Sequence, residues 1–260
     1  MECPTPLVGY EVAIHGCPRV DQHVHTTYSD GIDTPAACVS FALERGLTEI
    51  AFADHVWRKS AWVSRYADEV KALRDRVRRL GICIGLEAKA VDLNGNVDVT
   101  PQAASEVDFV MGVVHRYQPD NGGDLARLAP RAAAELETLI VLRMLENPLV
   151  NVIGHPTRTY YRFFYPDRTR APFPSDMIAE IAQAASARGK HIEYNTQIPL
   201  AERILDALVG QNVEFKFTLG SDAHQASAIG RIDFESISAA ARRASKLATD
   251  SQISSQERDA

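Results

Sequence analysis

Residues 20–31 read VDQHVHTTYSDG. The run 19–25 has the composition of a β-strand, and the turn signal Asp30-Gly31 follows it. His23 and His25 are two residues apart in this strand, so both imidazoles point to the same face. The stretch therefore predicts a strand that carries a pair of convergent histidines.

Six further runs of the same kind follow along the chain, and a helical pattern separates each run from the next. The seven predicted strands cover residues 19–25, 48–55, 82–90, 108–115, 150–155, 191–195 and 216–224. The predicted helices cover residues 35–45, 61–80, a short segment from 101, 126–146, 175–188, 199–209 and 234–248. This alternation predicts an α/β fold with a parallel sheet, either doubly wound or closed into a barrel.

The length and composition are those of one folded domain. The chain has 260 residues, of which 45% are hydrophobic, and no linker interrupts the alternation. We expect a single domain over residues 1–260, with its core at about 20–248 and a frayed tail at 249–260. The N-terminus lacks an apolar signal region, and no apolar run approaches the ~18 residues of a membrane span, so a cytoplasmic protein is expected.

Charge and cysteine usage argue against other classes of protein. Lys and Arg total 28 against 34 Asp and Glu, a formal charge of −6, so no extended nucleic-acid surface is expected. The four cysteines, Cys3, Cys17, Cys38 and Cys83, show no metal-type spacing and are too few for a disulfide framework. We interpret them as reduced structural thiols.

Further candidate metal ligands stand at the carboxyl ends of other predicted strands. They are His55, Glu87, His115, His155 and the pair Asp222 and His224. In a barrel, side chains from separate strands converge at this rim. Six of the eight histidines thus occupy one kind of position, whereas His15 and His191 do not. One such histidine alone is more often an ordinary hydrogen-bonded residue, but six together favour a metal site.

The order of these residues resembles the PHP (polymerase and histidinol phosphatase) superfamily, in particular a stand-alone phosphoesterase member. Residues 23–31 match its first motif, HxHTxxSDG, and Asp54-His55 matches its second. The later motifs are matched by Glu87, His115, His155 and Asp222-Ala223-His224. The resemblance extends from about residue 20 to residue 248.

This resemblance implies a distorted seven-stranded (β/α)7 barrel with a trinuclear metal centre at its C-terminal rim. One ion would be held by His23, His25, Glu87 and Asp222, a second by Glu87, His115 and His155, and a third by Asp30, His55 and His224. Mixed imidazole and carboxylate ligands suit Zn, Mn or Fe, so three such divalent ions are the expected cofactors.

The expected reaction is hydrolysis of a phosphate ester. A hydroxide bridging two ions would be the nucleophile, while the ions stabilise the phosphoryl oxygens. Catalytic roles are assigned to Glu87 and Asp222 as ligands and to His224, although an ion-bound water could equally protonate the leaving group. The favoured substrate is a small phosphomonoester. The alternative is a phosphodiesterase or exonuclease acting on short nucleic-acid ends or nucleotides.

Four residues near the predicted rim are candidates for binding the phosphorylated substrate. Arg116 and Arg158 follow ligand histidines and could clamp phosphate oxygens, although either could equally be a solvated surface arginine. Lys89 is on a strand that carries a ligand and could instead extend to solvent. Asn195 shares a strand face with Glu193, where the pair would contact substrate or form a buried hydrogen-bonded pair.

An aromatic and arginine-rich insertion is expected at residues 158–173. Its tyrosines and phenylalanines could stack on a flat substrate, but packing against the outer helices is the favoured interpretation. Trp57, just after His55, is a second aromatic near the rim, and packing is again the simpler explanation.

Overall fold

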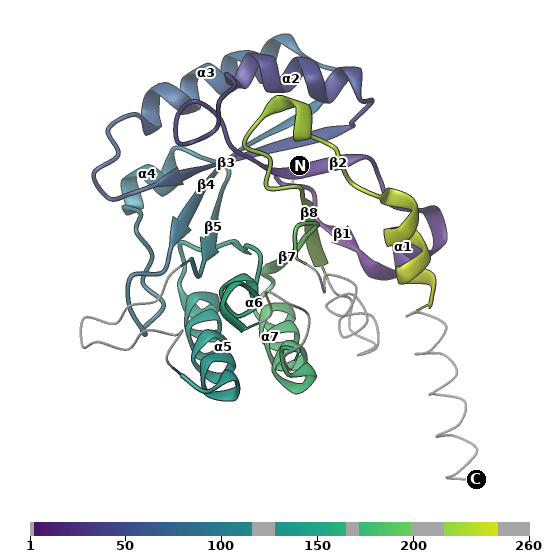
Figure 1. Cartoon of the computed structure of the whole chain (residues 1–260). Helices are drawn as coiled ribbons and strands as arrows, with labels where there is room; N and C mark the ends of the chain where they lie inside the picture. Colours follow the sequence, from purple (N-terminus) through teal and green to yellow (C-terminus); the bar gives the residue numbers. More distant parts are fainter. Residues whose placement is uncertain (1–2, 116–127, 165–171, 199–215, 244–260) are drawn as a thin grey trace.

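A computed structural model of the chain describes residues 3–115, 128–164, 172–198 and 216–243 (Figure 1). Its centre is one sheet of eight strands in the order β1-β8-β7-β6-β5-β4-β3-β2. Neighbouring strands are parallel except β1 and β8, which are antiparallel. The α/β class is therefore confirmed, but the expected seven strands are one too few because β1 joins the sheet.

Each of the seven predicted strands overlaps one of β2 to β8. The strands are β1 (Leu7–Val8), β2 (Val20–Val24), β3 (Glu49–Val56), β4 (Gly81–Lys89), β5 (Phe109–Val113), β6 (Val152–Ile153), β7 (His191–Asn195) and β8 (Lys216–Gly220). The helices are α1 (Gly9–His15), α2 (Pro35–Glu44), α3 (Val63–Arg76), α4 (Pro101–Ser105), α5 (Pro130–Glu146), α6 (Arg158–Phe164), α7 (Ser175–Ala187) and the 3₁₀ helix η2 (Ala226–Ala228). Residues 234–243 are also helical. The expected helix 199–209 and tail 249–260 lie outside the described residues.

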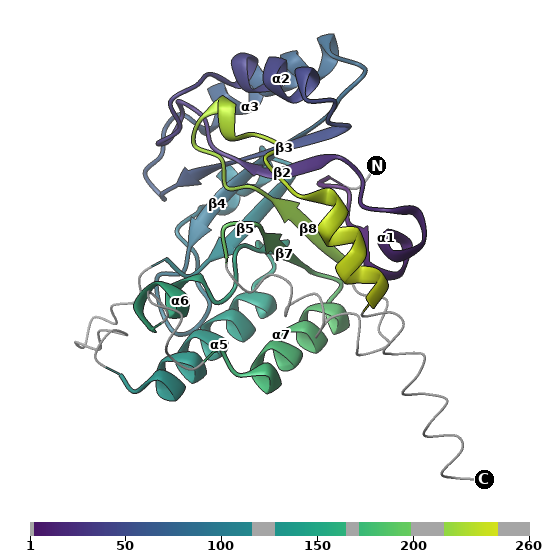
Figure 2. The ribbon, with the colours of Figure 1, turned by 45° about the vertical axis from the view of Figure 1, so that its right-hand side comes forward.

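The sheet curls until β2 lies beside β8 (Figure 2). A single bridge joins Val24 of β2 to Ala223, which follows β8, and side chains of β2 accept backbone N–H groups at and just after the end of β8. Asp21 Oδ1 accepts the N–H of Ser221 at 3.0 Å, and Gln22 Oε1 accepts the N–H of Leu219 at 2.9 Å. Polar side chains thus take the place of a strand ladder where the edges of the sheet meet.

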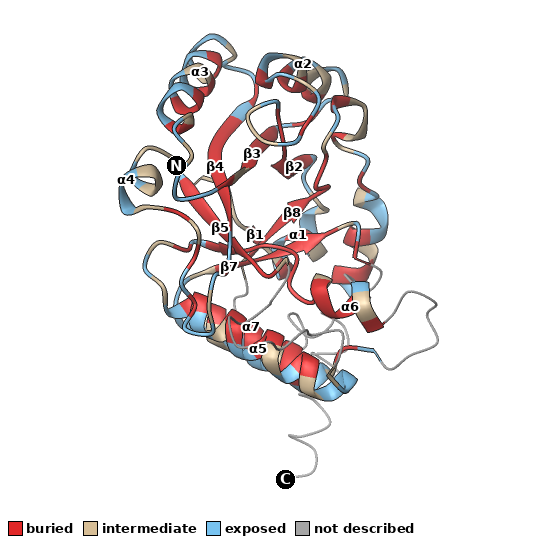
Figure 3. Cartoon of the chain, turned by 60° about the vertical axis from the view of Figure 1, so that its left-hand side comes forward, coloured by how far each residue is buried: buried red, intermediate tan, exposed pale blue. Residues whose placement is uncertain are grey.

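Helices cover the outside of the sheet, with α2 and α3 on one side and α5 and α7 on the other (Figure 1). Every residue of β2, β5, β6 and β7 is buried (Figure 3). Helices α2 and α4 begin with proline, and the preceding Thr34 and Thr100 accept backbone N–H groups through their hydroxyls. Among the described helices, none has the length and apolar character needed to cross a membrane.

Strand β1 belongs to the sheet, which thus begins at Leu7, before the expected core boundary at about residue 20. Cys3 forms a disulfide with Cys83 in β4. The interpretation of all four cysteines as reduced thiols is therefore wrong for this pair, while Cys17 and Cys38 are free. The error has a tertiary cause, since 80 residues separate the bonded cysteines and no local pattern brings them together.

The expected insertion at 158–173 begins as helix α6. Tyr160, Tyr161 and Phe164 are buried, and the Tyr160 ring meets the rings of Tyr161 and Phe173 edge-on. These aromatic side chains therefore pack into the core, which confirms packing over substrate stacking. Residues 165–171 of the insertion lie outside the described residues.

Candidate metal centre

Nine nitrogen- or oxygen-bearing side chains gather where the parallel strands end. They are His23 in β2, His25 and Asp30 after it, His55 in β3, Glu87 in β4, His115 after β5, His155 after β6, and Asp222 and His224 after β8. Eight of them form three groups whose potential ligand atoms lie within 4.8 Å of one another. The structure therefore brings together every residue that the sequence nominated as a ligand.

The first group contains His23, His25 and Asp222, all of them buried. The Nε2 atoms of the two histidines are 3.0 Å apart, and His25 Nε2 lies 3.2 Å from Asp222 Oδ1. His23 Nε2 lies 3.7 Å from the same oxygen. Three potential ligand atoms thus surround one point, as the spacing of the two histidines on one strand face predicts.

Glu87 joins the first group to the second, which consists of His55, Glu87 and His115. Its Oε1 lies 2.8 Å from His155 Nε2, 3.2 Å from His115 Nε2 and 3.7 Å from His23 Nε2. Its Oε2 contacts His55 Nδ1. One buried carboxylate therefore faces imidazoles from four strands, which is the position of a bridging ligand.

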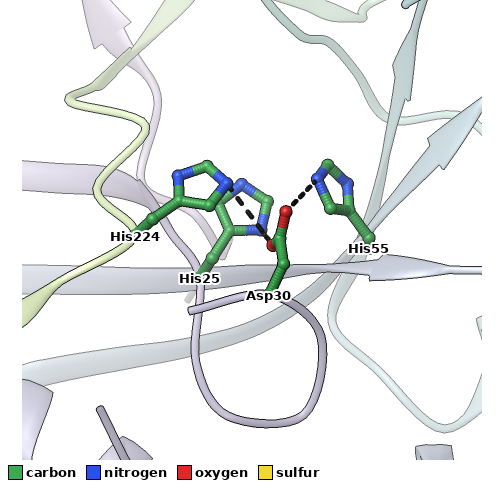
Figure 4. Close-up of side chains that lie close together, drawn as sticks. All are labelled: His25, Asp30, His55 and His224. Atoms are coloured by element: carbon green, nitrogen blue, oxygen red, sulfur yellow. Dashed lines mark ion pairs between the residues drawn. The ribbon is translucent and has the colours of Figure 1, made fainter. Parts of the chain in front are cut away.

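Figure 4 shows the third group, which contains His25, Asp30, His55 and His224. The two carboxylate oxygens of Asp30 face two imidazoles, with 3.4 Å from Oδ2 to His55 Nε2 and 3.4 Å from Oδ1 to His224 Nε2. The side chains of Asp30 and His224 are 54% and 38% exposed, whereas the first group is buried. The third group thus contains the most exposed of these donors.

The donor set fits divalent metal ions. Ring nitrogens approach each other in two places, between His23 and His25 and between His115 and His155, where Nε2 atoms are 3.0 and 3.3 Å apart. The buried Nδ1 of His25 has no hydrogen-bond partner among the described residues. A buried polar atom in that state is costly, and a cation shared with neighbouring carboxylates would satisfy it. Imidazole and carboxylate together suit Zn, Mn or Fe.

The electrostatics of the centre favour cations. Burial opposes the charged form of His23, but the negative charges of Glu193 and Asp222 raise its pKa to about 10. Burial likewise opposes ionisation of Glu87, yet hydrogen bonds from His115 and other imidazoles hold its pKa well below the usual range. Glu87 therefore remains ionised at neutral pH, and a metal ion would replace the proton on His23.

Glu193 in β7 orients two of the histidines. Its Oε1 lies 2.8 Å from His23 Nδ1, and its Oε2 accepts the backbone N–H of His155 at 2.6 Å. A carboxylate at Nδ1 leaves Nε2 of His23 to face the other donors, an arrangement that fixes the ring in metal sites. The sequence places Glu193 on one strand face with Asn195 but does not reveal its contact with His23.

Asp54, which precedes His55, holds the loop that carries Asp30. Its carboxylate accepts the N–H of Thr26 at 2.8 Å and the hydroxyl of Ser29 at 2.7 Å. The second sequence motif therefore combines one potential ligand with one residue that fixes the neighbouring loop.

The backbone of the site contains three non-glycine residues in the left-handed region, His155 (φ 25), Thr157 (φ 77) and Asp222 (φ 54). Such residues are uncommon and cluster at functional sites, where the surrounding structure maintains the strain. Gly220 in β8 is needed for a different reason, because a Cβ at this position would overlap His23 Cβ and Glu193 Oε1.

Arg158 is the expected substrate-binding residue that reaches a ligand group. It is the first residue of α6, and its guanidinium donates to Asp222 Oδ2 at 2.6 Å. Its side chain is 38% exposed, so it is available to a molecule that enters from solvent.

The other three expected substrate-binding residues have different placements. Lys89 forms an ion pair with Asp98, at 3.8 Å. Asn195 is buried and donates to Glu193 Oε1 at 3.2 Å, which corresponds to the buried hydrogen-bonded pair that was the alternative for it. Arg116 lies outside the described residues. Trp57 is 47% exposed, and its ring centroid is 6.4 Å from that of His55.

Comparison with known proteins finds relatives described as probable phosphatases. The chain is 26% identical over 226 residues to a probable phosphatase of Thermoanaerobacter sp. (strain X514), with 82% of each chain covered. It is 23% identical over 225 residues to a probable phosphatase of Vibrio parahaemolyticus, with 84% of this chain and 82% of the relative covered.

Solved structures share the fold. The histidinol phosphate phosphatase of Lactococcus lactis, complexed with Zn, L-histidinol and phosphate, matches with a TM-score of 0.64 and 25% identity over 88% of this chain and 93% of that one. A second solved structure, of a protein from Listeria monocytogenes, has the same TM-score at 18% identity, over 82% of this chain and 97% of its own.

A family model matches residues 21–197, from the first histidine motif to the loop after β7. Seven of the nine candidate ligands, including Glu87 and His155, lie within that span, and Asp222 and His224 follow it. The chain therefore belongs to the PHP domain family.

Proposed function

We propose that this protein is a metal-dependent phosphatase that hydrolyses a small phosphomonoester at the carboxyl ends of its strands. The observation that supports this most strongly is the convergence of nine metal-compatible side chains, eight of them in three adjoining groups and His155 in contact with Glu87. We assign His23, His25 and Asp222 to one ion, His115 and His155 to a second, and Asp30, His55 and His224 to a third, with Glu87 bridging the first two.

Three divalent ions, Zn, Mn or Fe, would supply Lewis acidity and a water of lowered pKa for attack on phosphorus. The protein would hold the metal ligands in place, and the proposed reaction needs no nucleophilic Ser or Cys. Only three of the nine ligands are carboxylates, so the loaded centre would be net positive and would attract a phosphate group.

Two exposed side chains would act on the substrate. The Arg158 guanidinium has the fork geometry that binds phosphoryl oxygens in pairs. The Nδ1 of His224 lies 3.0 Å from the backbone oxygen of Asp222, which favours a proton on Nδ1 and leaves Nε2 facing Asp30. His224 is thus placed as a ligand through Nε2, and it would donate a proton to the leaving group only when Nε2 carries a proton in place of the ion.

The substrate class rests on size and charge. A solved neighbour was complexed with L-histidinol and phosphate, the two products of a small phosphomonoester. Among the described residues, the exposed rim offers Arg158 as a cation in direct contact with a ligand group, which suits one phosphate group better than a long polyanion.

The test is release of inorganic phosphate from a panel of amino-alcohol, sugar, nucleoside and aryl phosphomonoesters by protein loaded with Zn, Mn or Fe. We expect turnover of at least one monoester and its loss after chelation. Absence of turnover by metal-loaded protein would refute the proposal. Degradation of single-stranded oligonucleotides from one end, at a higher rate than hydrolysis of any phosphomonoester in the panel, would instead favour an exonuclease.

A further inference from the structure

A second buried carboxyl group lies outside the metal centre. Glu137 is in the middle of α5, and it is 1% exposed. None of the three ligand groups contains it, and no motif in the sequence marks it. A buried carboxyl group without a cation beside it is expensive, so its surroundings must use it as a hydrogen-bonding group.

The partners of Glu137 are the first backbone N–H groups of α6. Glu137 Oε2 accepts the N–H of Tyr160 at 2.8 Å, and the N–H groups of Thr157 and Thr159 also interact with the carboxyl group. The first N–H groups of any helix lack partners within the helix. Glu137 therefore caps α6 from another helix, a role usually played by a side chain of the same turn.

The turn held in this way is strained. His155 and Thr157 have φ of 25° and 77°, the left-handed region that a β-branched residue such as Thr157 rarely adopts. Two buried carboxyl groups hold the two sides of the turn, because Glu193 accepts the N–H of His155 while Glu137 holds the start of α6. Strain of this kind persists only where neighbouring groups enforce it.

The turn determines where Arg158 points. Arg158 lies between Thr157 and Thr159, and its N–H donates to the backbone oxygen of His155 at 3.1 Å. Its guanidinium then reaches Asp222 Oδ2 at 2.6 Å. If the start of α6 were released, the backbone of Arg158 would relax from this position and the guanidinium would no longer be fixed at the ligand group.

We propose that Glu137 is a positioning residue, which holds the strained turn before α6 so that Arg158 is aimed at the phosphate group of the substrate. This inference rests on the proposed function, which supplies the phosphate group. Glu137 touches neither the substrate nor a metal ion and acts through Arg158. It would therefore affect phosphate binding while leaving metal binding intact.

The test uses Glu137→Leu and Glu137→Ala, which remove the acceptor, and Glu137→Gln, which keeps one acceptor oxygen for Tyr160. For metal-loaded protein we expect the Leu and Ala variants to bind inorganic phosphate about tenfold more weakly, the value of about one hydrogen bond. The affinity of the Gln variant for inorganic phosphate should stay within about twofold of that of the wild type, since its side chain still accepts the N–H of Tyr160. Glu135→Ala, an exposed position on the same helix, is the control.

A double-mutant cycle with Arg158→Ala separates positioning from general stabilisation. If Glu137 acts through Arg158, the double variant binds phosphate no more weakly than Arg158→Ala alone. Additive losses, or a loss of bound metal in Glu137→Leu, would overturn the inference. Calorimetric titration with phosphate measures binding and needs no turnover. A wild type that binds phosphate but hydrolyses no phosphomonoester would therefore refute the proposed function, while the titrations would still test the role of Glu137.

Hydrogen exchange gives a readout that needs no metal. In the wild type, the amides of Thr159 and Tyr160 should exchange slowly, and in Glu137→Leu they should exchange faster while β4 is unchanged. If the variants do not fold, the wild-type measurement remains decisive, because rapid exchange of these amides would contradict the role of Glu137.

Discussion

At the scale of single residues, the candidate metal ligands could be predicted from the sequence, but the residues that hold them and their neighbours in position could not. His23 and His25 are recognisable because a strand places residues two apart on one face. Glu193 and Glu137 act through contacts with residues far along the chain, such as the 2.8 Å contact of Glu193 with His23 across 170 positions. Only the tertiary structure brings such residues together. The sequence shows a glutamate at each position but does not show that it is buried or which residue it contacts.

Glu193→Gln should weaken metal binding without unfolding the protein. The amide would lose the negative charge that holds His23, and loss of such a support typically lowers metal affinity 10- to 100-fold. Titration with Zn or Mn in the presence of a competing chelator measures the effect. Glu180→Gln on α7 is the control, and equal affinities for both variants would contradict the role given to Glu193.

Glu137 predicts a pH dependence of stability. Burial raises the pKa of Glu137 to about 8, against an ordinary value of 4.5, while backbone hydrogen bonds oppose the shift. The folded state therefore holds this proton more tightly than the unfolded state, and stability is lost as the pH rises from about 5 towards 8. The slope is at most about 1.4 kcal/mol per pH unit.

The comparison with Glu137→Gln isolates this one group. Urea unfolding at pH 6 and pH 9 should show the wild type losing more stability than the variant. Parallel losses in the two proteins would mean that the carboxyl group of Glu137 does not titrate in this range.

At the scale of elements, regular alternation is visible in the sequence and short or irregular pieces are not. All seven parallel strands overlap the predicted runs, because most of them are short, buried, largely apolar segments that alternate with helical patterns. Strand β1 has two residues and hence no periodicity to detect. Helix α6 was expected as an insertion, since its start depends on a cap supplied by Glu137 of α5 rather than by a local residue.

Gly220→Ala should disturb the centre through β8. An added Cβ would overlap His23 Cβ and Glu193 Oε1, and overpacking of this kind costs about 1–3 kcal/mol. We expect a lower melting temperature together with weaker metal binding. Gly81→Ala in β4 is a matched control, because the nearest atom to its Cβ would be 3.3 Å away. Similar behaviour of the two variants would contradict this account of Gly220.

At the scale of the whole molecule, the N-terminal segment ties together strands from both sides of the curled sheet. Leu7 and Val8 pair with β8, Thr5 hydrogen-bonds to Glu49 in β3, and Cys3 is bonded to β4. The sequence predicted free thiols here because it shows spacing and not proximity. The segment therefore belongs to the structural base of the sheet, at the end opposite to the ligands.

Loss of the Cys3–Cys83 bond should destabilise the protein. A crosslink between residues 80 positions apart restricts the unfolded chain, and removal of such a bond costs about 2–5 kcal/mol. Urea unfolding with and without a reductant measures the loss, and Cys3→Ser should be insensitive to the reductant. Four free thiols in the unreduced, denatured protein would show that the bond does not form.

The central claim is that the strand-end side chains hold metal ions that are required for phosphate-ester hydrolysis. The most direct measurement is metal content per chain, determined together with phosphate release, for the wild type, Asp222→Asn and His15→Ala. We predict up to three ions and full activity for the wild type and for His15→Ala, and fewer ions with activity abolished for Asp222→Asn. Equal metal content and equal activity in all three proteins would contradict the account.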